Sequence, residues 1–402
     1  MSSWWQKTLA ATTASVAALT GLAGGVYYML MRRPLPKIKG KLHVQGLHEP
    51  VEVITDRYGV PHIYAGNEDD LFFAQGYVHA QERLWQMEFN RRLGSGRLSE
   101  LFGDVALDVD RFCRRLGMHR AAAAEVERQA EQSRRILAAY ANGVNAFIER
   151  NRRKLPIEFT LLRFKPAPWQ TSDSIQWAKM MGWGEGSNWE TEIIRARIVA
   201  KVGAERAARL EAGYDPGHPL IIPPGVEYKG INLGLLEQYE AIKQLSGFGM
   251  LGASNSWVVD GSMTVTGSPI LCNDPHLGQA APSIWYECHL VAGDIDVTGV
   301  SFPGTPGIVI GHNQHVAWGL TNAVSDVEDL YIEKFHPQNP IVSLADMNAS
   351  LSGHAPGQSG HVASKHYDDF IKPWLKVQHH PMLFERNTIE ANAEGTLHLL
   401  PG

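Results

Sequence analysis

The chain has 402 residues, of which 44% are apolar and 20% are charged, with a formal net charge of −5. This composition is typical of a globular protein with a sizeable core, and the mild charge gives no reason to expect a polyelectrolyte partner. The sequence has no basic stripe with interleaved aromatic residues, so nucleic-acid binding is not expected. Cys113, Cys272 and Cys288 are too few for a disulfide framework, so buried free thiols are expected, with a Cys272–Cys288 bridge as the alternative.

The N-terminal segment is apolar. Residues 8–31 carry no charge over 24 positions, which is long enough to cross a hydrocarbon core of about 30 Å. The pattern fits either a membrane anchor or a secretory signal cut near Ala23, and its length favours the anchor. Basic residues follow the segment more than they precede it, which by the positive-inside rule would place the body in the cytoplasm. Residues 1–33 are therefore assigned to an anchor or signal.

Helices are expected to dominate the first half of the chain. Residues 51–55 and 60–64 alternate apolar and polar positions around a turn, which predicts a β-hairpin. Asn67 is a good N-cap, so a helix is expected from there to about Arg92, before the glycines at 94 and 96. That helix should bury six apolar residues, namely Leu71, Phe72, Tyr77, Val78, Leu84 and Trp85. Further helices are expected over 118–150, from Thr171 or Ser172, and over 192–202.

The second half of the chain has the pattern of short strands. Between residues 213 and 252, Pro and Gly interrupt the pattern around one short helix at 233–245, so this stretch is the best candidate for a linker or spacer. Helices first and strands second predict an α+β fold rather than alternating βαβ units. Strands are expected at 256–259, 263–265, 270–272, 284–290, 295–300, 307–310, 316–319 and 330–334.

Motifs spread over residues 41–334 resemble those of one known family. Three lie in the first half, at 55–62 (TDRYGVPH), 74–87 (AQGYVHAQERLWQM) and 94–100 (GSGRLSE). The others follow in order: 254–259 (SNSWVV), 273–278 (NDPHLG), 302–304 (FPG), 311–313 (GHN) and 317–322 (AWGLTN). Together they resemble the penicillin acylase family of N-terminal nucleophile hydrolases. The first group is similar to the start of its small chain, and residue 254 is similar to the start of its large chain.

The resemblance implies a precursor that becomes an α/β heterodimer by self-cleavage. It implies αββα layers, in which antiparallel sheets lie between helices. On this basis residues 34–212 are the small-chain region, 213–253 the spacer, and 254–402 the beginning of the large chain. The family's further oxyanion-hole Asn and its supporting Arg lie beyond the sequence given, so the large chain is expected to be incomplete.

The resemblance also implies the catalytic groups. Cleavage between Ala253 and Ser254 would make Ser254 an N-terminal nucleophile. Its own α-amino group would take the hydroxyl proton, because the reference pKa of such a group is about 7.7 to 8.0. His276 falls at the position that hydrogen-bonds the new amino terminus, and the backbone amide of Asn322 falls at the oxyanion hole.

The resemblance implies a structural calcium site as well. Its ligands would be side chains of Asp326 and Asp329, the carbonyl of Glu328, and Glu192 from the first half. Hard oxygen ligands from two segments suit Ca²⁺ and would tie the two chains together. Without the family, the same acidic residues would be read as a solvated loop. No organic cofactor is expected.

The implied activity is hydrolysis of a small N-acyl amide, such as a β-lactam side chain, through an acyl-enzyme. Trp257 and Leu277 are the expected walls of the substrate pocket. An acyl-homoserine lactone acylase of the same family is an alternative. Members usually work outside the cytoplasm, so a membrane-anchored, periplasmic or extracytoplasmic body is expected despite the charge pattern.

Two other readings are open. A truncated, non-catalytic, membrane-anchored homologue would account for the missing downstream residues, although Ser254 and His276 are retained. A conventional Ser–His–Asp hydrolase is disfavoured, because Ser256 occupies the place of the second glycine in a Gly-x-Ser-x-Gly motif.

Overall fold

The computed structural model describes residues 18–36, 38–186, 189–210, 236, 239, 242, 254–322, 328–333, 335–336, 339–343 and 396–400. The chain divides into two compact units. Unit 1 comprises residues 1–101, 119–179 and 252–321, and unit 2 comprises residues 102–118, 180–251 and 322–402. Each unit therefore takes residues from both the small-chain region and the large-chain region.

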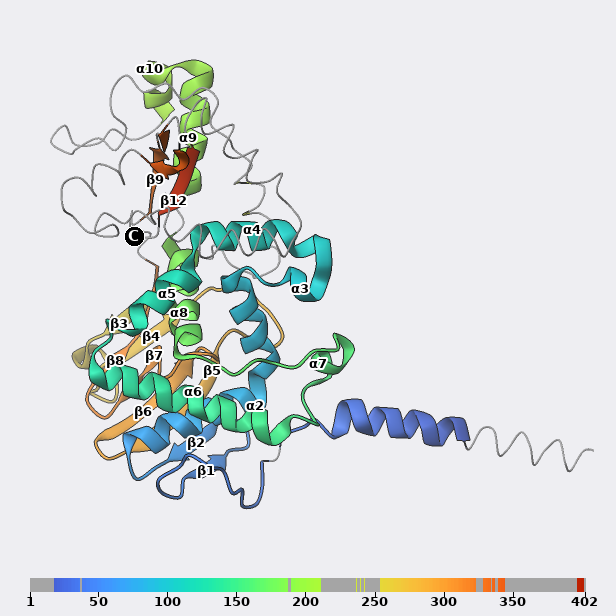
Figure 1. Ribbon diagram of the computed structural model, residues 1–402. Coiled ribbons are helices and arrows are strands. Elements are labelled where there is room, and N and C mark those ends of the chain that lie inside the picture. Colours follow the sequence, from blue (N-terminus) through green and yellow to red (C-terminus); the bar gives the residue numbers. More distant parts are fainter. Residues whose placement is uncertain are drawn as a thin grey trace, which may run out of the picture. The chain divides into compact units, whose positions relative to one another are not determined.

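Unit 1 is built on a six-stranded sheet with strand order β1-β2-β5-β6-β7-β8 (Figure 1). All neighbouring strands are antiparallel except β2 and β5, which run parallel, with Ile63 opposite Leu290. The predicted hairpin therefore forms and joins the large-chain strands in one sheet. The strands are β1 (Glu52–Thr55), β2 (Pro61–Tyr64), β5 (Tyr286–Ala292), β6 (Ile295–Ser301), β7 (Ile310–Asn313) and β8 (Ala317–Trp318).

Helix α2 (Glu68–Ser95) lies in unit 1 and has the predicted N-terminal cap, because the side chain of Asn67 accepts a hydrogen bond from the backbone of Asp70. Gly96 caps its C-terminal end in the left-handed conformation, which glycine adopts at little cost. Four of the six residues predicted to be buried are buried, and Tyr77 and Trp85 are partly buried. The inner face of β5 packs on this helix, and the resulting core contains Leu71, Phe72, Ala74, Val78, Tyr286, Cys288 and Leu290.

Helices α2 and α6 (Glu131–Asn151) pack against each other at two glycines (Figure 1). A Cβ atom at Gly76 would overlap the carbonyl of Tyr140, and one at Gly143 would overlap the carbonyl of Phe73. The two backbones can approach this closely only because neither position carries a side chain.

The helix predicted over residues 118–150 is two helices, α5 (Met118–Val126) and α6. The backbone is extended at Ala130, which separates them. The apolar residues of α6, such as Val144, repeat at helical spacing and pack against α2. Packing of this stripe sets the direction of α6, whereas α5 buries Met118 and Ala122.

The remaining elements of unit 1 include the hairpin that carries Ser254. It consists of β3 (Asn255–Val259) and β4 (Ile270–Asp274), joined through the short 3-10 helix Gly261–Met263. The strand predicted over residues 263–265 is therefore wrong. The hydroxyl of Thr264 donates to the carbonyl of Ser268 and closes a turn there instead. Unit 1 also contains α7 (Ile157–Leu161) and the first part of α8 (Thr171–Gly186), which starts where it was predicted.

Unit 2 contains the end of α8 together with α4 (Leu107–Leu116) and α9 (Trp189–Val202). Their aromatic residues Phe112, Trp183 and Trp189 form a buried cluster, and Tyr239 packs into it with its ring centroid 4.9 Å from that of Trp189. Tyr239 lies within the predicted spacer. The other elements of unit 2 are α10 (Ala204–Ala207) and the antiparallel pairs β9 (Asp329–Glu333) with β12 (Thr396–Leu400) and β10 (Phe335–His336) with β11 (Asn339–Ser343).

The structure also bears on the expected membrane segment and on the state of the cysteines. The expected membrane-spanning segment is not supported, because no helix in the described part of the chain is both long and apolar enough to cross a bilayer. Cys113, Cys272 and Cys288 are free thiols, so the alternative Cys272–Cys288 bridge does not form. The first part of the chain is mostly helical apart from β1 and β2, and strands dominate after residue 254, which agrees with the α+β class.

Candidate active site

Ser254 directly precedes β3, and both its side chain and its backbone are held within unit 1. Its Oγ accepts a hydrogen bond from the backbone N–H of His276 over 2.9 Å. Its carbonyl accepts one from the hydroxyl of Thr321 over 2.9 Å. An N–H group aimed at a serine oxygen stabilises negative charge on that oxygen, which is what a nucleophile needs. The other side of the predicted cleavage bond, Ala253, lies outside the described residues.

Asn273 connects the strand that follows Ser254 to the segment before Thr321. Its side-chain amide donates to the carbonyls of Asn255 and Leu320, each over 2.9 Å, and its side-chain oxygen accepts from the N–H of Leu320 at 3.0 Å. Asn273 lies in the family motif at residues 273–278, and the motif alone predicts no role for it. Only the fold reveals that one side chain holds both backbone segments around the serine.

The imidazole of His276 is held by the carboxylate of Asp274. Its Nε2 lies 2.9 Å from a carboxylate oxygen of Asp274, which is an acceptor, so Nε2 carries a proton. The side chain of His276 is 40% exposed and that of Asp274 is 76% exposed. The group that binds Ser254 Oγ is thus the main chain of His276, and the role predicted for its ring toward a free amino terminus stays a prediction.

Asn322, the predicted source of an oxyanion-hole amide, belongs to unit 2. Its side-chain amide donates to the backbone carbonyl of Glu185 over 2.6 Å and to the Glu185 carboxylate over 3.2 Å. Burial raises the pKa of Glu185, and the hydrogen bond from Asn322 opposes that rise. No local pattern predicts this pairing, because the residues are 137 positions apart.

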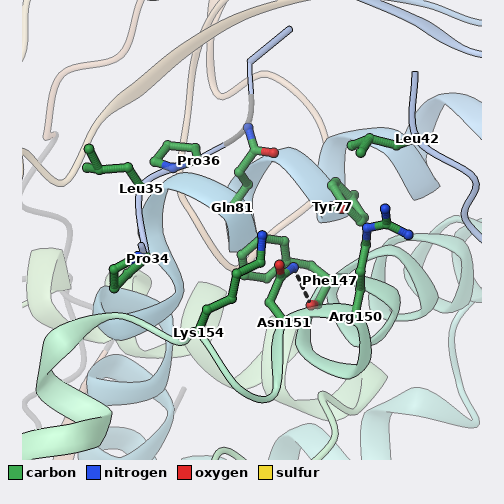
Figure 2. Close-up of a pocket in the computed structure, with 10 residues that line it drawn as sticks. All are labelled: Pro34, Leu35, Pro36, Leu42, Tyr77, Gln81, Phe147, Arg150, Asn151 and Lys154. Atoms are coloured by element: carbon green, nitrogen blue, oxygen red, sulfur yellow. Dashed lines mark hydrogen bonds between the residues drawn. The ribbon is translucent and has the colours of Figure 1, made fainter. Parts of the chain in front are cut away.

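The predicted pocket walls are partly open to solvent in this structure. Trp257 is 54% exposed on β3, and Leu277 is half-buried after β4. The cavity in Figure 2 lies elsewhere in unit 1 and contains none of the predicted site residues. It lies between the segment 34–42 and helices α2 and α6, with Gln81 and Lys154 among its lining residues.

Two of the four predicted calcium ligands are described in full. Glu328 is buried, and burial together with the charges of Glu190 and Glu192 raises its pKa to about 7. Three carboxyl groups of unit 2 therefore lie close enough to repel one another, which suits a cation. Within the described residues, no three His, Cys, Asp or Glu side chains form a complete metal-binding group. Asp326 and the side chain of Asp329 lie outside the described residues.

Comparisons with known proteins agree with the motifs. The family model described as penicillin amidase matches residues 50–343 and 340–391. Penicillin acylase 2 proenzyme from Pseudomonas sp. (strain SE83) is 38% identical over 315 residues, covering 76% of this chain and 40% of that protein. Acyl-homoserine lactone acylase QuiP from Pseudomonas aeruginosa is 34% identical over 343 residues, covering 83% of this chain and 40% of that protein.

A solved structure, thermostable penicillin G acylase from Alcaligenes faecalis, aligns at 29% identity and a TM-score of 0.37, covering 44% of this chain and 98% of that chain. The chain spans about 40% of the length of the two curated relatives above. The family model, however, matches well over half of the 402 residues. The chain belongs to the penicillin amidase family.

Proposed function

We propose that this chain is part of an amide hydrolase that removes an acyl group from a small N-acyl amide, with Ser254 as its nucleophile. The observation that carries the proposal is the hydrogen bonding of Ser254. Its Oγ and its carbonyl are each fixed at 2.9 Å by separate donors, and Asn273 holds the two flanking segments. These hydrogen bonds hold both the nucleophilic oxygen and the backbone of Ser254 in place, as a catalytic serine requires.

The proposed maturation step uses the same oxygen. Ser254 Oγ attacks the carbonyl carbon of Ala253, and the acyl group moves from nitrogen to oxygen. Water then hydrolyses the ester, which leaves a carboxylate on Ala253 and a free α-amino group on Ser254. A second hydrolysis, of the peptide bond between residues 212 and 213, would release residues 213–253 and leave a small chain and a large chain that together form the α/β heterodimer.

In the proposed turnover, Ser254 Oγ attacks the substrate carbonyl while its proton passes to the α-amino nitrogen. The N–H of His276 stabilises the charge on Oγ, and the N–H of Asn322 would stabilise the oxyanion of the tetrahedral intermediate. The ammonium proton then goes to the leaving amine. Water attacks the acyl-enzyme, the acid is released, and Oγ regains a proton.

The substrate class has two candidates. Relatives of similar identity carry the names penicillin acylase and acyl-homoserine lactone acylase, so β-lactam side chains and acyl-homoserine lactones are both proposed. Trp257 and Leu277 are proposed pocket walls. A panel that varies the acyl group on a constant amine would separate aromatic from long aliphatic preference.

Calcium is proposed as a structural ion of unit 2. Glu192 and Glu328 would supply oxygen ligands, together with Asp326 and Asp329, and an ion there would neutralise carboxylates that otherwise repel one another. The αββα layering is proposed as the architecture of the full-length protein. The small-chain region and the large-chain region already share one sheet and its covering helices.

The test of the proposed function is Ser254→Ala in the full-length protein. We expect neither chain splitting, read by intact mass, nor amidase activity. Ser256→Ala, two residues further along the chain and within β3, is the matched control and should split normally. Normal splitting of the Ser254→Ala variant would disprove the proposed nucleophile.

A further inference from the structure

The side chain of Asn273 ties together three backbone groups beside the nucleophile, all of them in unit 1. Its two N–H bonds are directed at the carbonyls of Asn255 and Leu320, each over 2.9 Å, and its oxygen accepts from the N–H of Leu320 over 3.0 Å. A side-chain amide has two donor hydrogens and one acceptor oxygen, so every polar group of Asn273 is engaged. No other uncharged side chain of this size supplies both donors and the acceptor.

The backbone at Gly319, the residue before Leu320, lies directly against this amide. A Cβ atom at Gly319 would lie 2.8 Å from the Cβ of Asn273, 2.9 Å from its Cγ and 3.0 Å from its Oδ1. Such carbon–carbon distances are well below van der Waals contact. The segment can therefore reach Asn273 only because residue 319 carries no side chain.

The two segments that Asn273 joins also carry two hydrogen-bond donors to Ser254. Thr321 follows Leu320 and donates its hydroxyl proton to the Ser254 carbonyl. The N–H of His276, three residues after Asn273, donates to Ser254 Oγ. The spacing between these two donors therefore depends on how Asn273 holds the segment at residues 320–321.

The proposed cleavage would increase the need for these contacts. In a precursor the chain restrains Ser254 from both sides, whereas a chain terminus is restrained from one side only and frays unless other contacts hold it. After cleavage, Ser254 would be kept in place by β3 on one side and by the donors from Thr321 and His276.

We propose that Asn273 is a positioning residue for amide hydrolysis, because its amide keeps both donors at Ser254 once the bond to residue 253 is cut. This rests on the proposed function. Asn273 acts through Thr321 and His276 and takes no part in making or breaking bonds.

The proposal predicts a loss of kcat with KM little changed. Asn273→Asp keeps the shape of the side chain but removes both donors, so kcat should fall by about 100-fold, the scale for a reacting group misplaced by about 1 Å. Asn273→Ala removes all three bonds and should be at least as slow. Gly319→Ala displaces the intact amide and should lower kcat by a smaller factor. Combined with Asn273→Ala, it should cost less than additivity predicts, because the same bonds can be lost only once.

The rate of splitting separates positioning from a general loss of structure. Residue 253 still restrains Ser254 in the precursor, so splitting should slow by a smaller factor than kcat does. Asn145→Ala is the matched control, because Asn145 exchanges the same pair of hydrogen bonds with the backbone of Trp169, at 2.9 and 2.6 Å, within unit 1. This variant should have a lower Tm and wild-type kcat per active site.

The measurements are splitting by intact mass and steady-state kcat and KM on full-length protein. Active sites are counted by complete labelling with a serine-acylating reagent, and thermal unfolding separates misfolded protein from slow protein. Wild-type kcat in Asn273→Asp would overturn the proposal, as would splitting slowed as much as kcat or an equal fall of kcat in Asn145→Ala. Wild-type protein that neither splits nor hydrolyses amides would instead refute the proposed function.

Discussion

Nδ1 of His79 and the hydroxyl oxygen of Tyr140 lie 2.7 Å apart, and both side chains are fully buried. The directions of the surrounding hydrogen bonds follow from the donors. Ser301 donates to the carbonyl of Tyr286, so its oxygen accepts from His79 Nε2–H. Tyr140 accepts from the backbone N–H of Gly304 and donates to Nδ1. The chain of bonds therefore requires a neutral imidazole and joins α2, α6 and β6 in one network.

The buried imidazole makes stability depend on pH. Burial first, and the charge of Arg83 second, lower the pKa of His79 to about 3. The unfolded chain binds this proton below about pH 6.5 and the folded protein does not, so stability falls as pH drops below that value and continues to fall toward pH 3. One such proton costs about 1.4 kcal/mol per pH unit in that range.

The corresponding measurement is thermal unfolding of wild type and His79→Gln between pH 7.5 and 5. We expect the variant to be less stable than wild type at pH 7.5, because glutamine does not reproduce both ring contacts. Its Tm should fall less than that of wild type when the pH is lowered. The difference in slope isolates His79 from the other titrating groups. Parallel plots of Tm against pH for the two proteins would mean that His79 is protonated in the folded protein.

Replacing His276 by alanine separates the two contacts at the nucleophile. The backbone N–H to Ser254 remains, and the imidazole that pairs with Asp274 is removed. We expect chain splitting to persist and kcat for amide hydrolysis to fall by about 100-fold, the lower end of the range for a lost proton-transfer group. His312→Ala, an exposed histidine on β7, is the control. An unchanged rate would make His276 a turn residue whose side chain is dispensable.

Tyr239 tests whether the predicted spacer leaves the protein. Its ring is 1% exposed and packs on Phe112, Trp183 and Trp189. In an unsplit Ser254→Ala background, Tyr239→Ala should cost about 3 kcal/mol and lower the Tm clearly, as deletion of a buried aromatic ring does. In matured protein, the same substitution should have no effect, because the residue would be gone.

The mass of the mature small chain gives the independent control for that experiment. A chain ending near residue 212 agrees with an unchanged Tm. An equal Tm loss before and after splitting, with a small chain that extends past residue 242, would show that this part of the segment is retained as core.

Calcium removal should destabilise the protein before it affects chemistry. Chelation leaves Glu328 buried beside Glu190 and Glu192, so we expect a lower Tm that returns on adding Ca²⁺. Binding at 100 times the dissociation constant would contribute about 2.7 kcal/mol. Glu328→Gln should weaken the calcium-dependent shift, whereas Glu205→Gln, 87% exposed on α10, should keep it. A Tm indifferent to chelation and Ca²⁺ would remove the proposed ion.

The elements with strong local signals were predictable. The hairpin β1–β2 and the capped helix α2 follow from alternation, an Asn N-cap and a C-terminal glycine, all of which act within a few residues. Ser254 and His276 were singled out by motifs, and the fold places the two residues in direct contact.

Contacts made across the chain were not predictable from local signals. The parallel pairing of β2 with β5 joins residues more than two hundred positions apart. The contacts of Asn273 with Leu320 and of Glu185 with Asn322 are also set by the fold, since a polar residue at these positions looks like any other turn or helix-end residue. The division between α5 and α6 depends in the same way on packing against α2.

The parallel pairing of Ile63 with Leu290 has a consequence for how the mature protein can be made. The proposed cleavage before Ser254 would turn a sheet within one polypeptide into a sheet shared by two, while the buried contacts stay in place. Denatured and separated, the two fragments would have to find each other in solution, and their reassembly would become slower on dilution. An uncut precursor would hold the two parts together while they fold, so splitting is expected to follow folding and to leave a structure that separate fragments would regain poorly.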